Sequence, residues 1–295
     1  MAHPTEQYFN DVVSSIVEAV KFDSSLKPAV PGCPFGKETA DCLAYFLNLA
    51  SKMGFETHNY DNYVGEVIYG EGEPLAILAH LDVVPAGEGW SHPPFGGEID
   101  DEVSDGGIGG MKIWGRGTMD DKGPAIATLY ALKALKDEGF MPKRKIKFIV
   151  GCNEETGWAC LKHYEEVAQM PEEGFSPDAS FPAIYAEKGI VHCDSYYPLN
   201  KDSFVSLHAG TAANMVCASA VAVLTDSSAK YVAQYEKAAA KQASSDKKLN
   251  GAAEKRDLHT AKNGAKWSYD ENTRTITFTG KSAHGSTPEK GVNAL

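Results

Sequence analysis

The sequence lacks a run of about 18 apolar residues, a CxxC pair and any internal repeat. A membrane-spanning helix needs about 20 consecutive apolar residues, so the first absence argues against a membrane protein. Without CxxC spacing, the six cysteines predict neither a zinc finger nor a disulfide scaffold, and reduced thiols in a cytoplasm are the simpler interpretation. The opening residues have no basic start and no continuous apolar centre, so we expect no secretory signal and a cytoplasmic location.

Basic residues are also few, since 28 Lys and Arg stand against 40 Asp and Glu, for a net charge of −12. Sequence-blind binding to nucleic acid or to an anionic membrane needs a basic surface. We therefore expect neither a nucleic acid nor a membrane as partner. With 295 residues, 43% of them hydrophobic and 10% aromatic, the chain is long and apolar enough for a globular protein of two domains.

Helix-like and strand-like patterns alternate along the first half of the chain. Apolar spacing predicts helices over residues 5–22 (with Thr5 as N-cap), 37–54 and 123–138. Short apolar runs predict strands over residues 64–69, 75–78 and 145–151. This alternation predicts an α/β fold with a mostly parallel, doubly wound sheet and helices on both faces.

The second half of the chain has a different composition, which places a domain boundary near residue 188. Residues 227–266 are rich in Ala, Lys and Ser and predict an exposed helix pair or a mobile segment. Residues 267–269 and 275–279 predict two strands joined by a short turn. Earlier in the chain, residues 85–117 are rich in Gly and Pro and predict a long functional loop or a hairpin.

Imidazole and carboxylate groups follow the predicted strands. His80 and Asp82 come at the end of the 75–78 run, and Glu154 and Glu155 directly follow residues 145–151. In doubly wound sheets, ligands bind beyond the carboxyl ends of the strands. Such groups suit a hydrolytic zinc, cobalt or manganese site, where a free carboxylate can take a proton from an activated water. Further candidates of the same chemistry are Asp120, Asp178 and His284.

Each candidate also has an ordinary structural interpretation. His80 alone can be a hydrogen-bonded core histidine. The Asp120-Asp121 and Glu154-Glu155 pairs can cap the helices that follow them. Asp178 can be a turn residue and His284 a surface-loop residue, as single positions of these types often are. Taken singly, these interpretations are favoured, but the recurrence at successive strand ends favours a site.

Four tracts of the chain resemble the co-catalytic zinc exopeptidase family: LAILAHLDVVPAGEGW, KIWGRGTMDDKGPAIATLYALKALKDEG, KFIVGCNEETG and FSPDASFPAIYAEKG. That family includes the PepV-type dipeptidases, the carnosinases, acetylornithine deacetylase and succinyl-diaminopimelate desuccinylase. The tracts HLDVVPAGEGW and GKSAHGSTPEKGVNA are similar to the PepV-type branch in particular. The resemblance is dense over residues 75–192 and returns over residues 279–294.

The resemblance implies an enzyme with two divalent metal ions, zinc in the first instance, with manganese or cobalt as alternatives. It implies that His80 and Asp178 bind the first metal, that Glu155 binds the second and that Asp120 bridges both. Asp82 would orient the His80 imidazole, and Glu154 would be the general base. His284 would donate to the oxyanion of the tetrahedral intermediate, and Asn214 would contact the substrate.

The resemblance further implies a catalytic metal-binding domain over residues 1–188 and an incomplete α+β lid domain over residues 189–295. The expected activity is metal-dependent hydrolysis of dipeptides with a free N-terminus, Xaa-His dipeptides included, so the expected partner is a small peptide. An amide deacylase of the acetylornithine or succinyl-diaminopimelate type and an inactive fragment of such an enzyme remain open alternatives. Substrate side chains, the native metal and the oligomeric state also remain open.

The chain departs from the family in two places. Family members are considerably longer, and their later segments carry a further His ligand of the second metal and an Arg that grips the substrate carboxylate. None of His92, His163, His192, His208 and His259 stands in a comparable context. We therefore expect a C-terminally truncated gene model or fragment, with weak activity or none. Residues 99–113 are longer than the usual turn and are expected to enlarge a loop beside the site.

Overall fold

The fold is described from a computed structural model of the chain. The described residues are 6–87, 89–100, 111–179, 184, 186, 189, 191, 193–196, 198–210, 215–234, 264–285 and 287–294. The chain divides into two units, Met1–Ile184 (unit 1) and Tyr185–Leu295 (unit 2). Among the described residues, no helix combines the length and the apolar character needed to cross a membrane.

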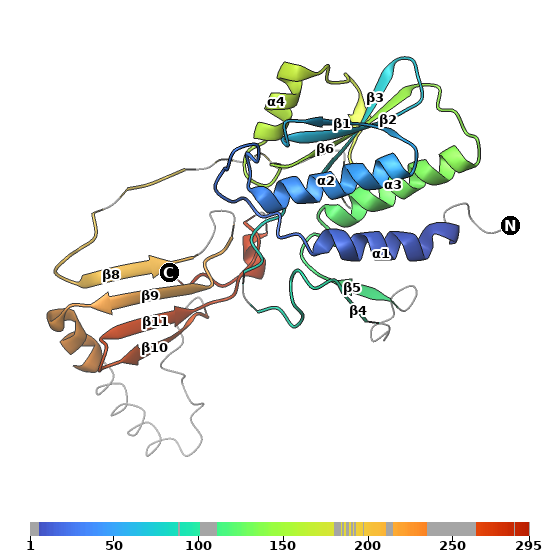
Figure 1. The fold of residues 1–295 in the computed structure, drawn as a ribbon. Helices are drawn as coiled ribbons and strands as arrows, with labels where there is room; N and C mark the ends of the chain where they lie inside the picture. Colours follow the sequence, from blue (N-terminus) through green and yellow to red (C-terminus); the bar gives the residue numbers. More distant parts are fainter. Residues whose placement is uncertain are drawn as a thin grey trace. The chain divides into compact units, whose positions relative to one another are not determined.

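Unit 1 contains a five-stranded sheet in the order β1-β2-β6-β3-β7, together with four helices, α1 to α4, within its described part (Figure 1). The strands are β1 (Glu56–Tyr60), β2 (Val64–Tyr69), β3 (Pro74–His80), β6 (Lys145–Gly151) and β7 (Gly174–Phe175). The helices are α1 (Phe9–Val20), preceded by the 3-10 turn Glu6–Tyr8, α2 (Lys37–Lys52), α3 (Lys122–Asp137) and α4 (Ala159–Val167). A separate hairpin pairs β4 (Glu98–Asp100) with β5 (Lys112–Trp114).

The direction of the strands confirms the predicted α/β sheet. Strand β3 is parallel to both β6 and β7, whereas β2 is antiparallel to both β1 and β6. It follows that β1, β6, β3 and β7 all run the same way and that β2 alone is reversed. The reversal comes from the turn between β1 and β2, where Asp61 and Asn62 have φ values of 52° and 60°. Two successive left-handed residues make a tight hairpin, which returns the chain antiparallel.

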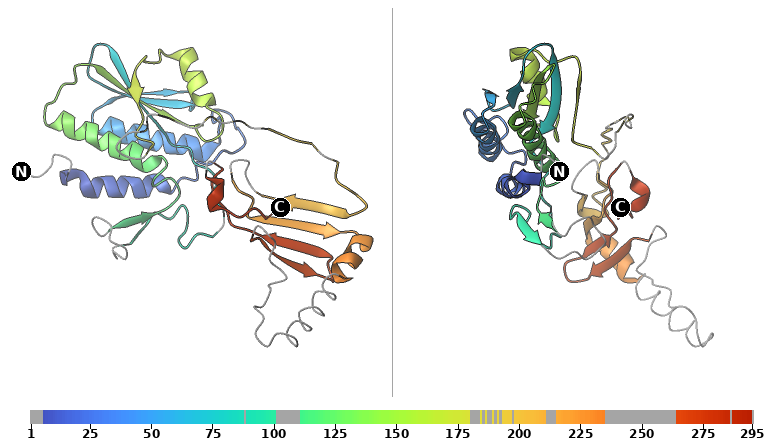
Figure 2. Two further views of the ribbon diagram at one scale, coloured as in Figure 1. Left: turned by 180° about the vertical axis from the view of Figure 1, so that it is seen from behind. Right: turned by 90° about the vertical axis from the view of Figure 1, so that its right-hand side faces the viewer.

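Helices cover both faces of this sheet, as predicted. A Cβ on Gly65 of β2 would meet the side chains of Leu43 and Leu47 in α2. The next residue, Glu66, is instead hydrogen bonded by Tyr164 of α4. Because successive strand residues point to opposite faces, α2 and α4 lie on opposite faces, and Figure 2 shows α3 beside α2 and α1 outside them. The core between these layers includes Leu43, Phe46, Ile126, Leu129, Phe148 and Ile149.

Unit 2 is built on a four-stranded antiparallel sheet in the order β10-β11-β9-β8. Its strands are β8 (Phe204–Ala209), β9 (Ser219–Leu224), β10 (Lys266–Asp270) and β11 (Thr275–Thr279), followed by the 3-10 turn Pro288–Lys290. The hairpin predicted over residues 267–279 is confirmed. A small core of Ala222, Leu224 and Ala229 supports the sheet. Most of the predicted 227–266 segment (residues 235–263), the tip of the 85–117 loop (residues 101–110) and Thr5 lie outside the described residues.

Candidate metal centre

Four segments that are distant in sequence meet at the carboxyl edge of the unit 1 sheet. His80 is the last residue of β3 and pairs in register with Gly151, the last residue of β6. Glu154 and Glu155 follow β6, Asp178 follows β7, and the Asp120 loop leads into α3. This is the edge at which parallel α/β sheets hold their ligands.

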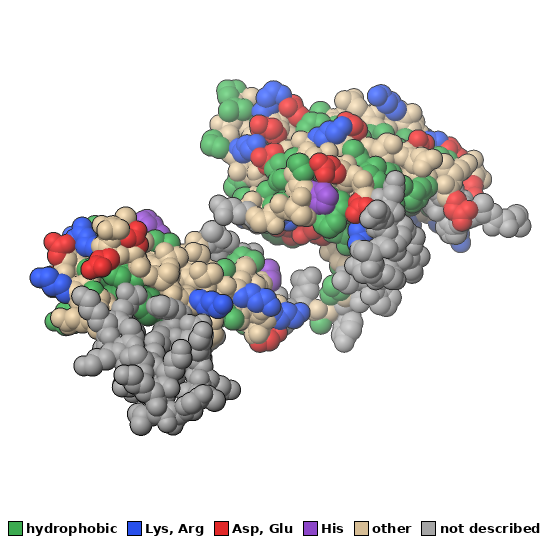
Figure 3. Space-filling model, turned by 90° about the horizontal axis from the view of Figure 1, so that it is seen from below, with side chains coloured by type: hydrophobic (Ala, Val, Ile, Leu, Met, Phe, Trp, Pro, Cys, Tyr) green, Lys and Arg blue, Asp and Glu red, His purple; other side chains and the backbone are tan. Residues whose placement is uncertain are grey.

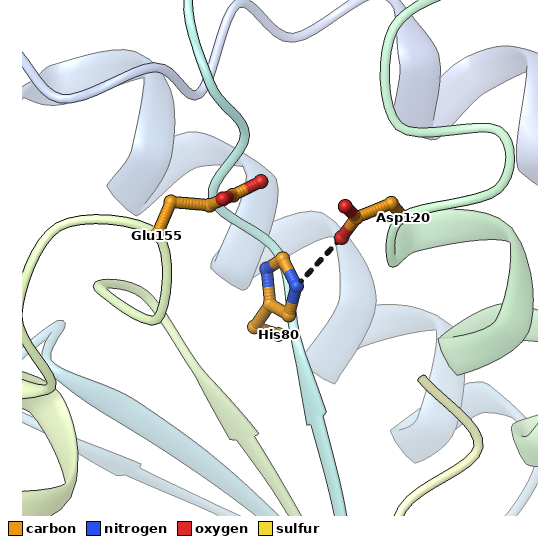
Figure 4. Close-up of side chains that lie close together, drawn as sticks. All are labelled: His80, Asp120 and Glu155. Atoms are coloured by element: carbon orange, nitrogen blue, oxygen red, sulfur yellow. Dashed lines mark hydrogen bonds and ion pairs between the residues drawn. The ribbon is translucent and has the colours of Figure 1, made fainter. Parts of the chain in front are cut away.

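The imidazole of His80 is the centre of the cluster and is only 2% exposed. Its Nε2 atom lies 3.0 Å from Asp120 Oδ1, 3.3 Å from Asp178 Oδ2 and 3.8 Å from Glu154 Oε2. Figure 4 shows Asp120 and Glu155 entering from opposite sides of His80, with Glu155 coming from the loop after β6. One ring nitrogen therefore faces three carboxylates, a concentration of negative charge that favours a cation.

Asp82 is buried and connects His80 to the Glu154-Glu155 loop. Its backbone carbonyl oxygen lies 2.9 Å from His80 Nδ1, and its carboxylate lies farther, at 3.4 Å. The same carboxylate accepts the backbone N–H of Glu154 at 3.0 Å and that of Glu155 at 3.1 Å. Asp82 therefore fixes the positions of both glutamates, a contact that the sequence does not predict.

The loop that carries Asp120 depends on close approach of the backbone at two glycines. Gly117 has φ of +88°, a conformation that L residues rarely adopt. Gly123 donates its N–H to the carbonyl oxygen of Gly117 at 3.1 Å. A Cβ on Gly123 would lie 2.0 Å from the carbonyl oxygen of Thr118. Only glycine fits there, so the GRGTMDDKG tract fixes where the Asp120 side chain begins.

Asp121 is a site residue for which the sequence predicts no metal or catalytic role. It is fully buried, and its Oδ2 accepts the backbone N–H of His80 at 3.1 Å. It is the N-cap residue of α3 but makes no side-chain cap hydrogen bond, so the helix-capping interpretation of this residue is wrong. Its Oδ1 atom is buried without a hydrogen-bond partner. The only signal in the sequence is the doubled aspartate, which is equally compatible with a helix cap.

Burial and mutual repulsion raise the pKa values of the acidic groups. Burial, reinforced by the negative charge of Asp178, raises the pKa of Asp121 to about 7. Burial, reinforced by the negative charge of Asp120, also raises the pKa of Glu155 to about 7. Burial also raises the pKa of Glu154. Burial alone would lower the pKa of His80, but hydrogen bonds to Asp120, Asp178 and Asp82 outweigh it and raise this pKa well above its ordinary value. Such clusters of shifted groups are typical of functional sites.

The donor set fits a divalent metal ion. Ligand atoms of His80, Asp120 and Glu155 all lie within 4.8 Å of one another, as do those of His80, Asp121 and Asp178. Imidazole nitrogen with carboxylate oxygen is the ligand chemistry of hydrolytic zinc sites. The unpartnered Oδ1 atom of Asp121 and the crowding of carboxylates around one imidazole are both features that a bound cation would stabilise.

The two remaining predicted site residues belong to unit 2. His284 forms an isolated backbone bridge with Met215. Asn214 lies outside the described residues. On the face of unit 1 shown in Figure 3, basic and acidic side chains are interspersed with hydrophobic ones.

The part of the chain that matches a known protein family includes the residues of this cluster. The model of peptidase family M20/M25/M40 matches residues 76–272. The beta-Ala-Xaa dipeptidase of Lactobacillus delbrueckii subsp. lactis is 35% identical over 290 residues, covering 96% of this chain and 56% of that protein. The chain spans about half the length of the curated relatives it matches.

Among solved structures, human carnosine dipeptidase 1 matches with a TM-score of 0.44 and 24% identity, over 55% of this chain and 36% of that one. A Bacillus subtilis protein described as a dinuclear metal binding peptidase from the M20 family matches with a TM-score of 0.37 and 14% identity, over 55% and 40% of the two chains. The family match covers most of the chain, including all the described carboxylates around His80. The chain therefore belongs to peptidase family M20/M25/M40.

Proposed function

We propose that the protein hydrolyses dipeptides with a free N-terminus, using two divalent metal ions, zinc in the first instance. The observation that carries this proposal is the convergence of His80, Asp120, Glu155 and Asp178 at one sheet edge, in a chain of this peptidase family. The name of the Lactobacillus relative supports β-alanyl dipeptides as the first substrates to test. The unpaired thiols of all six cysteines support a cytoplasmic location.

In the proposed arrangement, His80 and Asp178 would hold one metal ion, Glu155 would hold the other, and Asp120 would be a ligand of both. Metal ions bound there would lower the pKa of a water molecule and polarise the scissile carbonyl group. Glu154 would accept the proton of that water, and its part-buried side chain at this edge and its raised pKa, which makes it a stronger base, support this role.

The other residues are proposed to position the two glutamates and the substrate and to stabilise the oxyanion. Asp82 holds the backbone of Glu154 and Glu155 in place, so the base keeps its position while its side chain gains and loses a proton. Under this proposal, His284 donates a hydrogen bond to the developing oxyanion and Asn214 contacts the substrate.

The proposal is tested by zinc content and dipeptide hydrolysis of the same sample, with Asp120→Ala as the site variant and Glu71→Gln as the surface control. We expect zinc to bind to the chain and to the control, and to be lost or strongly reduced in Asp120→Ala, with weak β-Ala-His hydrolysis following the zinc. Hydrolysis of acetylated amino acids without any hydrolysis of dipeptides would contradict the proposed substrate class. Zinc binding that Asp120→Ala leaves unchanged would contradict the proposed site.

A further inference from the structure

A small hollow lies beside the candidate metal centre, within unit 1. Its volume is about 80 Å³, and a single water molecule needs about 10–15 Å³. His80, Glu154 and Asp178 lie on its lining, and the other lining residues are largely apolar: Leu78, Ala79, Gly151, Trp158, Cys160, Leu161 and Ser176. Apolar walls with a few polar groups are the usual form of a small-molecule site.

Trp158 is the large aromatic residue of this lining, and its backbone is unusual. It has φ of 63° and ψ of 22°, in the left-handed region, directly before α4. For a bulky residue this conformation is a true outlier, and such outliers cluster at ligand sites. The side chain is also left 46% exposed, although it is among the most apolar available. Neither helix propensity nor core packing accounts for tryptophan at this position.

The turn that holds Trp158 is the turn that carries Glu154. Trp158 donates its N–H to the carbonyl oxygen of Asn153 at 2.8 Å, and the side-chain oxygen of Asn153 accepts the N–H of Ala159 at 3.0 Å. The Asn153 amide also donates to the hydroxyl of Thr156. Asn153 is buried and directly precedes Glu154. The backbone from which the indole projects is therefore fixed relative to the residue proposed as general base.

We propose that Trp158 forms the wall of a substrate subsite that accepts an apolar side chain of the dipeptide next to the scissile bond. This rests on the proposed function. A leucine-sized side chain in the hollow would bury apolar surface against Trp158, Leu78 and Leu161, whereas a glycine would bury none. An acidic side chain is disfavoured because the largely apolar lining of the hollow would take its carboxylate out of water without a compensating partner.

The test measures binding of four phosphinic dipeptide analogues to the zinc-loaded chain by calorimetry: Leu-Gly, Gly-Leu, Asp-Gly and Gly-Gly. The variants are Trp158→Gly, which removes the indole and suits the left-handed backbone, and Trp158→Phe, which keeps an aromatic wall. Asp61→Gly is the matched control, since Asp61 has φ of 52° and lies outside the hollow. Thermal unfolding of each variant and hydrolysis of the corresponding dipeptides are measured on the same samples.

We expect the unmodified chain to bind one leucine analogue roughly tenfold more tightly than Gly-Gly, and Asp-Gly no more tightly than Gly-Gly. Trp158→Gly should lose this preference without a lower unfolding temperature, while Trp158→Phe and Asp61→Gly should keep it. A preference that is missing in the unmodified chain, or unchanged in Trp158→Gly, would overturn the subsite. A preference without hydrolysis of any dipeptide would overturn the proposed function alone, and failure of every analogue to bind would overturn both.

Discussion

At the scale of single residues, the carboxylates around His80 connect metal binding to protonation. Burial, together with the charge of Asp120, raises the pKa of Glu155 to about 7. A carboxyl group with this pKa holds its proton at pH 6 and has lost it at pH 8, and a metal ligand must be deprotonated. We therefore expect zinc binding to release more protons at pH 6 than at pH 8, measured by calorimetry in buffers of different ionisation enthalpy.

Two variants distinguish the protons released by Glu155 from those released by neighbouring groups. Protons released by His80, whose pKa is raised well above its ordinary value, are expected at both pH values, so they cancel in the comparison. Glu155→Gln should reduce the difference between pH 6 and pH 8, and Glu71→Gln should leave it unchanged. Equal release at the two pH values in the unmodified chain would contradict the raised pKa of Glu155.

The sequence predicts which residues belong to the site, but it does not predict all the hydrogen bonds between them. His80 and Glu154 were expected together because carboxyl ends of parallel strands share an edge, Asp120 and Asp178 were added by the family resemblance, and the structure brings all four together. Their catalytic roles remain predictions. The hydrogen bond from the His80 backbone to Asp121 could not be predicted, because an aspartate before a helix is normally its cap.

The conformation of Trp158 could not be predicted either. It depends on the hydrogen bonds that Asn153 makes to Ala159 and Thr156 after the chain has turned. A tryptophan has no preference for left-handed backbone that the sequence could show. Contacts of this kind are decided by tertiary structure, so they become visible only when the fold is known.

At the scale of elements, α4 is held to the sheet by a polar cluster of buried Glu66 and Tyr164 with part-buried Lys147. The Lys147 Nζ atom lies 3.1 Å from Glu66 Oε2 and 2.9 Å from the Tyr164 hydroxyl, which donates to Glu66. Glu66 is only 1% exposed, so Lys147→Met would leave its carboxylate buried without a cation. We expect a loss of about 3–5 kcal/mol in the free energy of unfolding, measured by urea titration.

A double variant shows whether the buried charge is the cause. Glu66→Gln together with Lys147→Met removes both charges and should recover most of the lost stability. Lys162→Met, an exposed lysine of α4, is the control and should change stability little. A loss below about 1 kcal/mol in Lys147→Met would mean that the ion pair contributes little to holding α4.

The loop before α3 gives a second prediction at this scale. Gly123→Ala would place a Cβ against the backbone oxygen of Thr118, which has no flexible side chain to move away. We expect displacement of the Asp120 loop and a loss of zinc affinity of roughly tenfold or more, measured by competition with a chelator. Gly189→Ala is the control, since a Cβ there meets nothing within 4 Å. Unchanged zinc affinity in Gly123→Ala would show that this loop does not position a ligand.

The helices and strands that the sequence predicts correctly are those with a clear apolar pattern. The strand over 145–151 and the helix that begins near residue 123 are observed as β6 and α3. Strand β1 was missed because its sequence, ETHNY, is polar and mostly exposed at the sheet edge. Strand β7 was missed because two residues carry no periodicity. Both are held by pairing with stronger neighbours, a long-range effect that a local pattern does not contain.

At the scale of the whole molecule, the two units differ in what they contribute to the site. The ligand candidates His80, Asp120, Glu155 and Asp178, together with the large hydrophobic core, all belong to unit 1, Met1–Ile184. Unit 2 has a much smaller described core, of Ala222, Leu224 and Ala229. A domain needs its own core to fold alone, and unit 1 has one.

We therefore expect residues 1–184, produced without unit 2, to fold and to bind zinc with the stoichiometry of the whole chain. Circular dichroism and urea unfolding would establish the fold, and equilibrium dialysis would give the zinc content. Asp120→Ala in the shortened chain should remove zinc as is expected for the whole chain, because the same side chains are proposed to hold the ion in both. A folded 1–184 chain that binds fewer zinc ions than the whole chain would show instead that unit 2 supplies a ligand, and the histidines of unit 2 would then be replaced one at a time to find it.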